Sequence, residues 1–395
     1  MCKAAAMSGP GAVHDRLRVA VDATPLLAPL TGVGEFCVGA FEAMGTDPSL
    51  ELRAFAVSWP RRRRLAPVLP AGIAAVERPM PARPLHAAWR RAPYPPIEWF
   101  VPGVDVVHGT NFVVPPSRRA VQVVTVHDIG FIRFPELSIP AAGVFGPLVR
   151  KAVARGAWVH TPSRFVADEV VEEFGVEPSR VRAIAHGIPA HTLDRLRRAA
   201  GARADAPPVS LPAGTGRYIV AVGTIEPRKD LPTLVRAFDR LAGARPDVAL
   251  VIAGGEGWGV EPLDEAVHRS SFASRIVRTG YVPDDVLARL LAGAAVLAFP
   301  SLYEGFGLPP LEAMAAGVPV VATAAGAVPE VVGDGAVVVP VADPDALADG
   351  LASVLDDDDR RAALVAAGSR RAAQFSWESC AAGLAALYRA ASGRV

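Results

Sequence analysis

Two carboxylates eight residues apart lie near the end of the chain, in the stretch PSLYEGFGLPPLEAMAAGVPVVAT at 300–323. Glu304 precedes a glycine-rich turn. Glu312 follows in a segment that Pro309 and Pro310 predict to be the start of a helix, because proline is tolerated in a first helical turn. Carboxylates accept several hydrogen bonds at once and therefore suit the hydroxyl groups of a polyol. The alternative is structural: Glu304 would cap the turn and Glu312 would complement the helix dipole.

The backbone between the two acids could bind an anion. Gly305 and Gly307 let the main chain approach a ligand closely. The N–H groups around Phe306, Gly307 and Leu308 would point out of the predicted helix N-terminus, where anions bind. The segment therefore predicts a phosphate site flanked by two hydroxyl-binding carboxylates.

Two adjacent cations in VGTIEPRKDL (222–231) occupy an unfavourable position for positive charge. Arg228 and Lys229 come after a predicted strand and its turn at Gly223, directly before a predicted helix, where positive charge opposes the dipole. A bound diphosphate would compensate the two positive charges, since arginine binds phosphate through two parallel N–H groups and lysine through a movable point charge. The alternative is two solvated loop cations.

The first half of the chain supplies a second group of candidates. Gly32, Val33 and Gly34 of TGVGEF form a loop between a predicted strand and helix, although a glycine pair is often no more than a tight turn. His127 and Asp128 end the strand VQVVTV, which favours a site role over that of a core histidine. Three further polar residues end other predicted strands: Asn111, Ser163 and His186.

Short apolar runs alternate with helical patterns along the chain, which predicts parallel sheets covered by helices on both faces. The expected strands are 17–23, 51–57, 104–109, 121–128, 157–163 and 181–187, then 217–223, 247–255, 275–281, 294–301, 318–323 and 336–340. Expected helices in the first half include 34–44, 139–155 and 164–174. The fold class is therefore α/β, with two Rossmann-like doubly wound domains facing across a cleft.

The expected domains are 1–200 and 217–375, joined by a Pro- and Gly-rich linker at 201–216. A last helix, within 376–395, could cross back to the first domain. Doubly wound domains bind ligands at the carboxyl ends of their strands, which is where the candidate residues fall.

Composition and charge limit the classes of protein to which this chain can belong. Half of the 395 residues are apolar (51%), the three cysteines lack metal-ligand spacing, and neither a signal peptide nor a membrane helix is predicted, which favours a cytoplasmic protein. Residues 1–200 hold 24 Lys and Arg against 17 Asp and Glu, and the remainder 17 against 23. The excess arginines cluster near tryptophans at 59–100, which is compatible with solvated loops or with an anionic membrane surface or acceptor. No nucleic-acid motif accompanies them.

Taken together, the glycine loop TGVGEF, the VHD at 126–128, the GTIEPRKD block and the E-x7-E segment make the chain similar to retaining glycosyltransferases of the GT-B family 4. The resemblance covers nearly the whole length and implies a nucleotide-sugar donor bound by the second domain. It implies that Arg228 and Lys229 bind the diphosphate, that Glu304 and the backbone of 305–308 hold the donor sugar and phosphate, and that Glu312 binds the ribose.

The resemblance also assigns roles outside the E-x7-E segment. It implies that the loop at 32–34 closes over the phosphates, that His127 contacts the transferred sugar, and that the backbone of Tyr281 and Val282 contacts the base. The acceptor side would include Asp128, Asn111 and Ser163. No metal or other cofactor is expected, since no D-x-D cluster stands in the usual place.

One motif bears on the identity of the donor sugar. The stretch GTIEPRKDL resembles the corresponding stretch of mannosyltransferases, which favours GDP-mannose as the donor over UDP-glucose or UDP-N-acetylglucosamine. The acceptor is expected to be a glycan, a lipid-linked saccharide or a small molecule. Retention could use a covalent intermediate on Glu304 or, as we expect, same-face attack. The alternative of another class is a nucleotide-sugar sensor without turnover.

Overall fold

Two parallel sheets organise the computed structural model, which describes residues 16–28, 32–201 and 208–394. In the first sheet the order is β3-β2-β1-β4-β5-β6-β7, and in the second β10-β9-β8-β11-β12-β13. The strands of the first sheet are β1 (Leu17–Asp22), β2 (Leu50–Phe55), β3 (Ala74–Val76), β4 (Val106–Gly109), β5 (Val121–Thr125), β6 (Trp158–Thr161) and β7 (Val181–Ala183). Those of the second are β8 (Arg217–Val222), β9 (Val248–Ala253), β10 (Ile276–Gly280), β11 (Val296–Phe299), β12 (Val320–Thr323) and β13 (Ala336–Val339).

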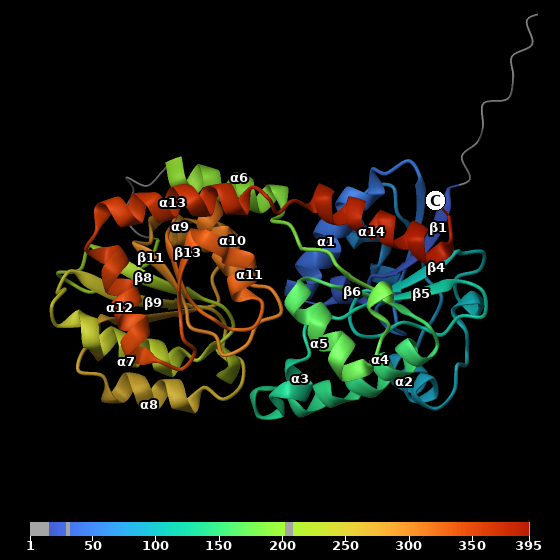
Figure 1. Ribbon diagram of the computed structural model, residues 1–395, viewed down its shortest axis with the longest axis horizontal. Coiled ribbons are helices and arrows are strands. Elements are labelled where there is room, and N and C mark those ends of the chain that lie inside the picture. The colour runs from blue at the N-terminus through green and yellow to red at the C-terminus, as the bar shows by residue number, and fades with distance from the viewer. Residues whose placement is uncertain (1–15, 29–31, 202–207, 395) are drawn as a thin grey trace, which may run out of the picture.

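Helices cover both sheets (Figure 1). In the first half of the chain they are α1 (Gly32–Gly45), α2 (Ala82–Arg91), α3 (Gly130–Arg133), α4 (Phe145–Ala154), α5 (Arg164–Phe174) and α6 (Ala190–Gly201). In the second they are α7 (Leu231–Ala242), α8 (Glu261–Arg269), α9 (Asp284–Gly293), α10 (Leu308–Ala315), α11 (Val328–Val332), α12 (Pro344–Leu355), α13 (Asp358–Ala372) and α14 (Trp377–Ser392).

The expected fold class is confirmed, and each strand expected from an apolar run is present in shortened form. The sequence analysis missed β3, a three-residue edge strand at Ala74–Val76 that is partly exposed and whose apolar run is short and rich in alanine, a residue depleted in strands. It also placed the start of one helix too early: the expected helix 139–155 has a 3-10 segment at Pro140–Val144, and α4 begins at Phe145.

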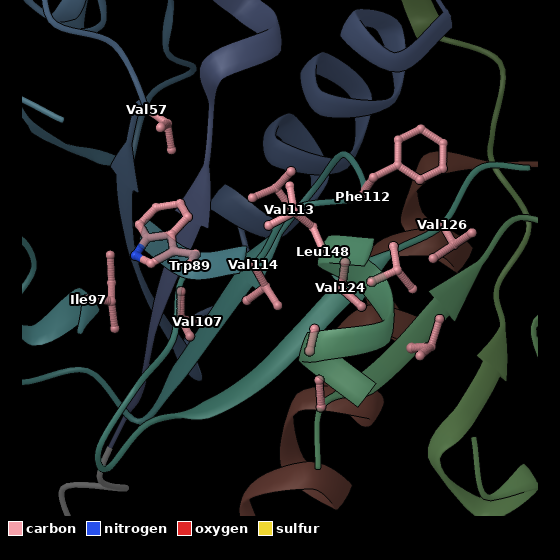
Figure 2. Packing of buried hydrophobic residues seen from close by; sticks show 14 of the residues in the cluster. Val57, Trp89, Ile97, Val107, Phe112, Val113, Val114, Val124, Val126 and Leu148 are labelled. Atoms are coloured by element: carbon pink, nitrogen blue, oxygen red, sulfur yellow. The ribbon is translucent and has the colours of Figure 1, made fainter. Parts of the chain in front are cut away.

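Both domains have continuous apolar cores because parallel strands are buried on both faces. In the first domain, Trp89 of α2 lies in one buried cluster with Ile97 and Val107, and its indole N–H donates to the carbonyl of Pro95 at 3.0 Å (Figure 2). This packing fixes the loops after α2 on the sheet.

The chain crosses between the domains twice. Helix α6 packs against α9 and α10 of the second domain, and Leu196 of α6 is in that domain's core. The first crossing therefore precedes α6, near Gly187, and not the segment 201–216 that composition suggested; residues 202–207 lie outside the described part. The sequence pattern shows that α6 is amphipathic but not which sheet buries its apolar face.

The second crossing leads into α14, which runs along α1 of the first domain (Figure 1). Trp377 at its start and Tyr388 near its end are buried in the cluster that contains Phe36 and Phe41 of α1. Gly39 of α1 makes room for this contact, since a Cβ there would lie 2.2 Å from the Trp377 ring. The first domain is thus completed by the last helix of the chain.

Candidate active site

A cleft with a volume of about 530 Å³ opens between the domains. Its lining combines residues of the first domain (Gly32, Val33, Glu35, His127, Asp128, Pro162 and His186) with residues of the second (Gly223, Thr224, Glu226, Arg228, Lys229, Glu304, Gly305, Phe306, Gly307, Leu308, Pro309 and Glu312). Most sequence-derived candidates therefore meet in one place. Gly34, Asn111, Ser163, Tyr281 and Val282 are not among the lining residues.

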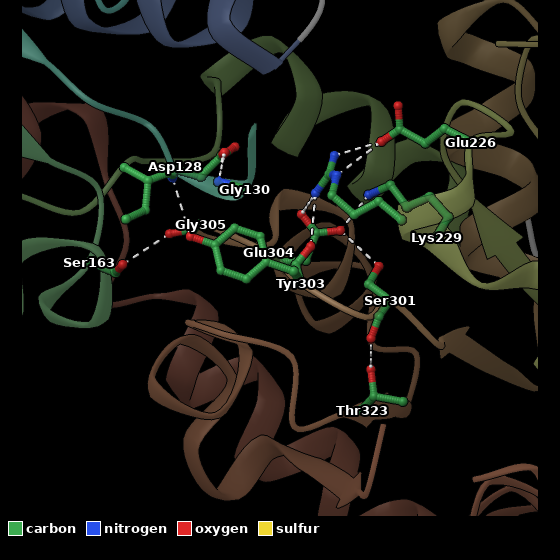
Figure 3. Close-up of polar contacts among 12 residues, drawn as sticks. Asp128, Gly130, Ser163, Glu226, Lys229, Ser301, Tyr303, Glu304, Gly305 and Thr323 are labelled. Carbon is green, nitrogen blue, oxygen red and sulfur yellow. Dashed lines mark hydrogen bonds and ion pairs between the residues drawn. The ribbon is translucent and has the colours of Figure 1, made fainter. Parts of the chain in front are cut away.

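Glu304 lies at the centre of a compact charge network (Figure 3). Arg228 Nη1 lies 2.5 Å from Glu304 Oε2, and Lys229 Nζ lies 2.6 Å from Oε1, which also accepts from Ser301 Oγ at 2.7 Å. Arg228 in turn binds Glu226 through Nη2 at 2.7 Å. Burial by itself would raise the pKa of the Glu304 carboxyl, but Arg228 and Lys229 outweigh it and lower the pKa to about 2. Glu304 is ionised throughout the physiological range.

Local backbone geometry brings the two cations to Glu304. Gly223 after β8 has φ 143, and a Cβ there would meet the Lys229 side chain at 3.3 Å. Asp230 has φ 43 and ends the 3-10 turn Pro227–Lys229 directly before α7. The amide of Leu302 donates to the carbonyl of Arg228 at 2.8 Å, which ties this turn to the loop that carries Glu304.

The glycine loop after Glu304 is held against the first domain. A Cβ on Gly305 would lie 2.0 Å from the carbonyl oxygen of His127, so glycine is required for this approach. Ser163 Oγ donates to the Gly305 carbonyl at 2.9 Å and accepts from the Val166 amide as N-cap of α5. The hydroxyl of Ser163 therefore links α5 of the first domain to the glycine loop of the second.

Helix α10 begins at Leu308 after Gly307, which has φ 115. Because Pro309 and Pro310 follow and lack N–H groups, the amides available near this terminus are those of Phe306, Gly307 and Leu308. The loop offers these donors beside the cations Arg228 and Lys229. This arrangement can receive a phosphate group.

His127 and Asp128 lie two and three residues beyond β5. His127 Nε2 donates to the carbonyl of Thr110 at 2.9 Å, and burial lowers the pKa of its imidazole to about 4, so His127 is neutral at pH 7. A carbonyl oxygen accepts and never donates, so Nε2 carries the proton and Nδ1 is the acceptor. The Asp128 carboxylate accepts from the Gly130 amide at 2.9 Å; burial raises its pKa, and the nearby Arg228 opposes that shift.

Glu312 faces a different environment from Glu304. Burial, together with Glu35 of α1 and Asp284 of α9, raises the pKa of its carboxyl to about 7. The pKa of Glu35 is likewise raised by burial. The two acids of the E-x7-E segment are therefore opposite in character: Glu304 is neutralised by cations, and Glu312 holds its proton to near-neutral pH.

Four remaining candidates lie elsewhere. Tyr281 is 79% exposed and, with Val282, follows β10 outside the cleft lining, and Gly34 is buried inside α1. The buried Oδ1 of Asn111 has no hydrogen-bond partner within the described ranges.

The cleft also contains residues that sequence reasoning did not single out: Glu35, Pro162, Thr224, Glu226 and Pro309. Glu226 lies two residues before Arg228 in the quoted block, so its proximity could have been expected. Glu35 comes from the other domain, and no sequence spacing relates it to Glu312.

Across the described residues, no group of three or more His, Cys, Asp or Glu side chains is arranged to hold a metal ion. The same residues include no helix that is both long and apolar enough to span a membrane.

Comparison with known proteins shows which family the chain is similar to. The model for Glycosyl transferases group 1 matches residues 203–371, and that for Glycosyltransferase Family 4 matches residues 48–191. The O-antigen chain mannosyltransferase B of Escherichia coli is 34% identical over 280 residues, which are 70% of this chain and 71% of that protein. The MMP alpha-(1->4)-mannosyltransferase of Mycolicibacterium hassiacum is 35% identical over 317 residues, 74% of this chain and 72% of its own.

Solved structures agree on the fold. Anabaena HepE in complex with UDP and glucose superposes with a TM-score of 0.66 at 18% identity, over 94% of this chain and 99% of its own. The sucrose-phosphate synthase of Thermosynechococcus elongatus superposes with a TM-score of 0.73 at 20% identity, over 95% and 99%. With both domains matched by family models and the cleft built as described, the chain belongs to the family 4 (group 1) glycosyltransferases of GT-B fold.

Proposed function

We propose that this glycosyltransferase moves a hexose, mannose from GDP-mannose as the first choice, to a hydroxyl group of a glycan or lipid-linked saccharide with retention of configuration. The observation that carries the proposal is the convergence of Arg228, Lys229 and Glu304 with the amides of 306–308 in one interdomain cleft. The names of the two mannosyltransferase relatives support mannose over glucose.

The chemistry requires stabilisation of a departing nucleoside diphosphate. Arg228 and Lys229 supply two positive charges, and the backbone amides of 306–308 supply hydrogen bonds, from groups that are already fixed before the reaction. These groups can stabilise the developing charge without a metal ion, and we propose a metal-independent reaction. Cations already paired with Glu304 need little rearrangement to turn toward a diphosphate.

Glu304 suits sugar binding better than nucleophilic attack. Its Oε1 accepts from both Lys229 and Ser301, and its Oε2 accepts from Arg228. Three of the four lone-pair sites of the carboxylate are therefore engaged, which lowers its nucleophilicity and leaves one site for a sugar hydroxyl. We therefore favour same-face attack by the acceptor, with the leaving phosphate as base. A glycosyl adduct on Glu304 detected by mass spectrometry would contradict this mechanism.

We propose that the first domain binds the acceptor. Trp59, Tyr94 and Trp99 are about half exposed there, next to the arginine clusters at 61–64 and 90–91. Exposed aromatic and basic side chains suit the headgroup region of an anionic membrane, so we propose peripheral contact and a lipid-linked acceptor. Sedimentation with anionic vesicles at low salt tests this contact, and loss of sedimentation in a variant with Arg61 to Arg64 changed to serine is the expected result.

Thermal stability against GDP-mannose, UDP-glucose, UDP-N-acetylglucosamine, GDP and UDP tests the donor. A ligand at 100 times its dissociation constant adds about 2.7 kcal/mol to the free energy of unfolding. We expect stabilisation by the guanine compounds and its loss in Arg228→Ala. Stabilisation by uridine compounds alone would replace GDP-mannose by a UDP-sugar. Binding without turnover of any acceptor would favour a sensor.

A further inference from the structure

Four buried histidines gather at the carboxyl edge of the first sheet: His108, His127, His160 and His186. Three of them surround the ring of Phe36, whose centroid lies 5.3 Å from that of His127, 5.5 Å from His160 and 4.8 Å from His186. Each of the four histidines is at least nine-tenths buried. Burial lowers the pKa of each imidazole, so all four are neutral at pH 7.

Two of these histidines belong to a hydrogen-bond chain whose proton order is fixed. His160 Nε2 donates to the Ile184 carbonyl at 3.0 Å, so its Nδ1 accepts from Thr125 Oγ1 at 2.9 Å. Thr125 then accepts from His108 Nε2 at 2.7 Å, and His108 Nδ1 accepts from the Tyr388 hydroxyl at 2.7 Å. His127 has its own carbonyl partner, as described above. These three side chains are held by the protein itself.

His186 differs from the other three. Its Nε2 is buried and has no hydrogen-bond partner within the described residues. Its ring is nevertheless fixed, because it stacks on Phe36 and, at 5.9 Å, on Trp377, and its centroid lies 5.1 Å from that of Phe306. A polar nitrogen that is buried, immobile and unpartnered costs free energy unless a ligand completes it.

The surroundings of His186 indicate what that ligand is. His186 lines the cleft, 5.6 Å from the ring of His127 and in contact with Phe306, two residues after Glu304. Our proposed function places Glu304 on the transferred sugar, and the family resemblance implies the same contact for His127. The unpartnered Nε2 of a neutral imidazole offers one hydrogen bond and no charge, which matches a hydroxyl group rather than a phosphate.

We propose that His186 forms a hydrogen bond with one hydroxyl group of the hexose being transferred and so helps to determine which sugar the enzyme accepts. The inference rests on the proposed function and deepens it. His186 sits where the chain first crosses between the domains, so the same contact would couple sugar recognition to the relative position of the domains.

The test compares the effect of replacing His186 with the effect of removing one hydroxyl group from the donor, separately and together. The wild-type protein and His186→Phe, which keeps the ring stacking, are assayed with GDP-mannose, UDP-glucose and the monodeoxy analogues of whichever donor is turned over. Removing a single contacted hydroxyl is expected to lower kcat/KM of the wild type by about 10-fold, in line with one neutral hydrogen bond. In His186→Phe the parent donor should show a similar loss, and that deoxy donor should show no further loss.

His186→Gln, whose amide can replace Nε2, is expected to restore the discrimination, and it carries the test if His186→Phe fails to fold. His268→Phe, at an exposed position of α8, is the matched control and should behave as wild type. If the losses add for every analogue while the wild type turns over the parent donor, the inference is overturned and the proposed function stands. If the wild type turns over no nucleotide sugar, the proposed function fails and the inference with it.

Discussion

Glu330 of α11 caps a helix of the other domain: its two carboxylate oxygens accept hydrogen bonds from the backbone amides of Arg164 and Phe165, each at 3.0 Å. These amides are the first two of α5, where a carboxylate also complements the helix dipole. With Ser163 bound to Gly305 and the Tyr303 hydroxyl 2.5 Å from Glu169, this contact holds the domains together beside the cleft.

Removing this cap should weaken domain closure. In Glu330→Ala we expect KM for the donor to rise by about 3- to 10-fold, because exposed charge-assisted hydrogen bonds contribute on the order of 1 kcal/mol. Small-angle scattering should show a larger radius of gyration. Asp334→Ala, four residues later and also exposed, is the control. An unchanged radius together with an unchanged KM would show that Glu330 has no part in closure.

Gly305→Ala tests whether catalysis requires this close approach of the domains. A Cβ at Gly305 would collide with the His127 carbonyl, so the loop cannot lie where it does now, although each domain keeps its own core. We expect activity to fall by roughly 100-fold or more with a small change in Tm, since positioning errors of this size are costly to catalysis. Gly216→Ala is the control, because nothing lies within 4 Å of its added Cβ. Normal activity in Gly305→Ala would refute the requirement.

Glu304→Gln tests whether Glu304 acts as the counter-ion of Arg228 and Lys229 or contacts the nucleotide directly. Arg228 and Lys229 lose their shared counter-ion, so the free energy of unfolding should fall by about 1–3 kcal/mol, measured by denaturant titration. Turnover should fall by about 100-fold or more. Calorimetry should show that GDP binding is kept or strengthened, because both cations are then free for phosphate. Loss of GDP binding would mean that Glu304 itself contacts the nucleotide.

Glu312 should make both stability and donor affinity depend on pH. The folded protein holds the Glu312 proton to a pKa of about 7, above the ordinary value of 4.5, so its contribution to stability is full at low pH and is lost as pH rises through that window. Glu312→Gln should therefore raise Tm relative to wild type at about pH 8 and change it little at about pH 5.

We propose that the ionised Glu312 carboxylate accepts hydrogen bonds from the ribose hydroxyls of the donor. Wild-type donor affinity should then rise with pH through neutrality, and Glu312→Gln should lack this rise. Isothermal titration of GDP at several pH values measures it. Equal pH dependence in both proteins would assign the titration to another group, of which Glu35 is the nearest candidate by its own raised pKa.

Much of the fold could be predicted from the chain because its information is local. Continuous apolar runs bounded by turns define buried parallel strands, and all twelve expected strands are present. The strand β3 was missed because its apolar run is short and consists mainly of alanine, which is depleted in strands. The boundary at α6 was misplaced because amphipathicity shows that a helix buries one face but not against which domain.

By itself, the sequence determined the chemical types at the site: a glycine loop before a helix, two adjacent cations, two acids eight residues apart and a histidine beyond a strand. Each is a short-range pattern whose meaning follows from backbone geometry. The tertiary structure decided how they combine. Glu304 pairs with Arg228 and Lys229, and Glu35 lies near Glu312, although the partners are 75 to 277 residues apart in the chain. The unpartnered nitrogen of His186 likewise depends on burial that both domains create. Such contacts are set by how the two sheets and the returning helix α14 pack, which no local pattern encodes.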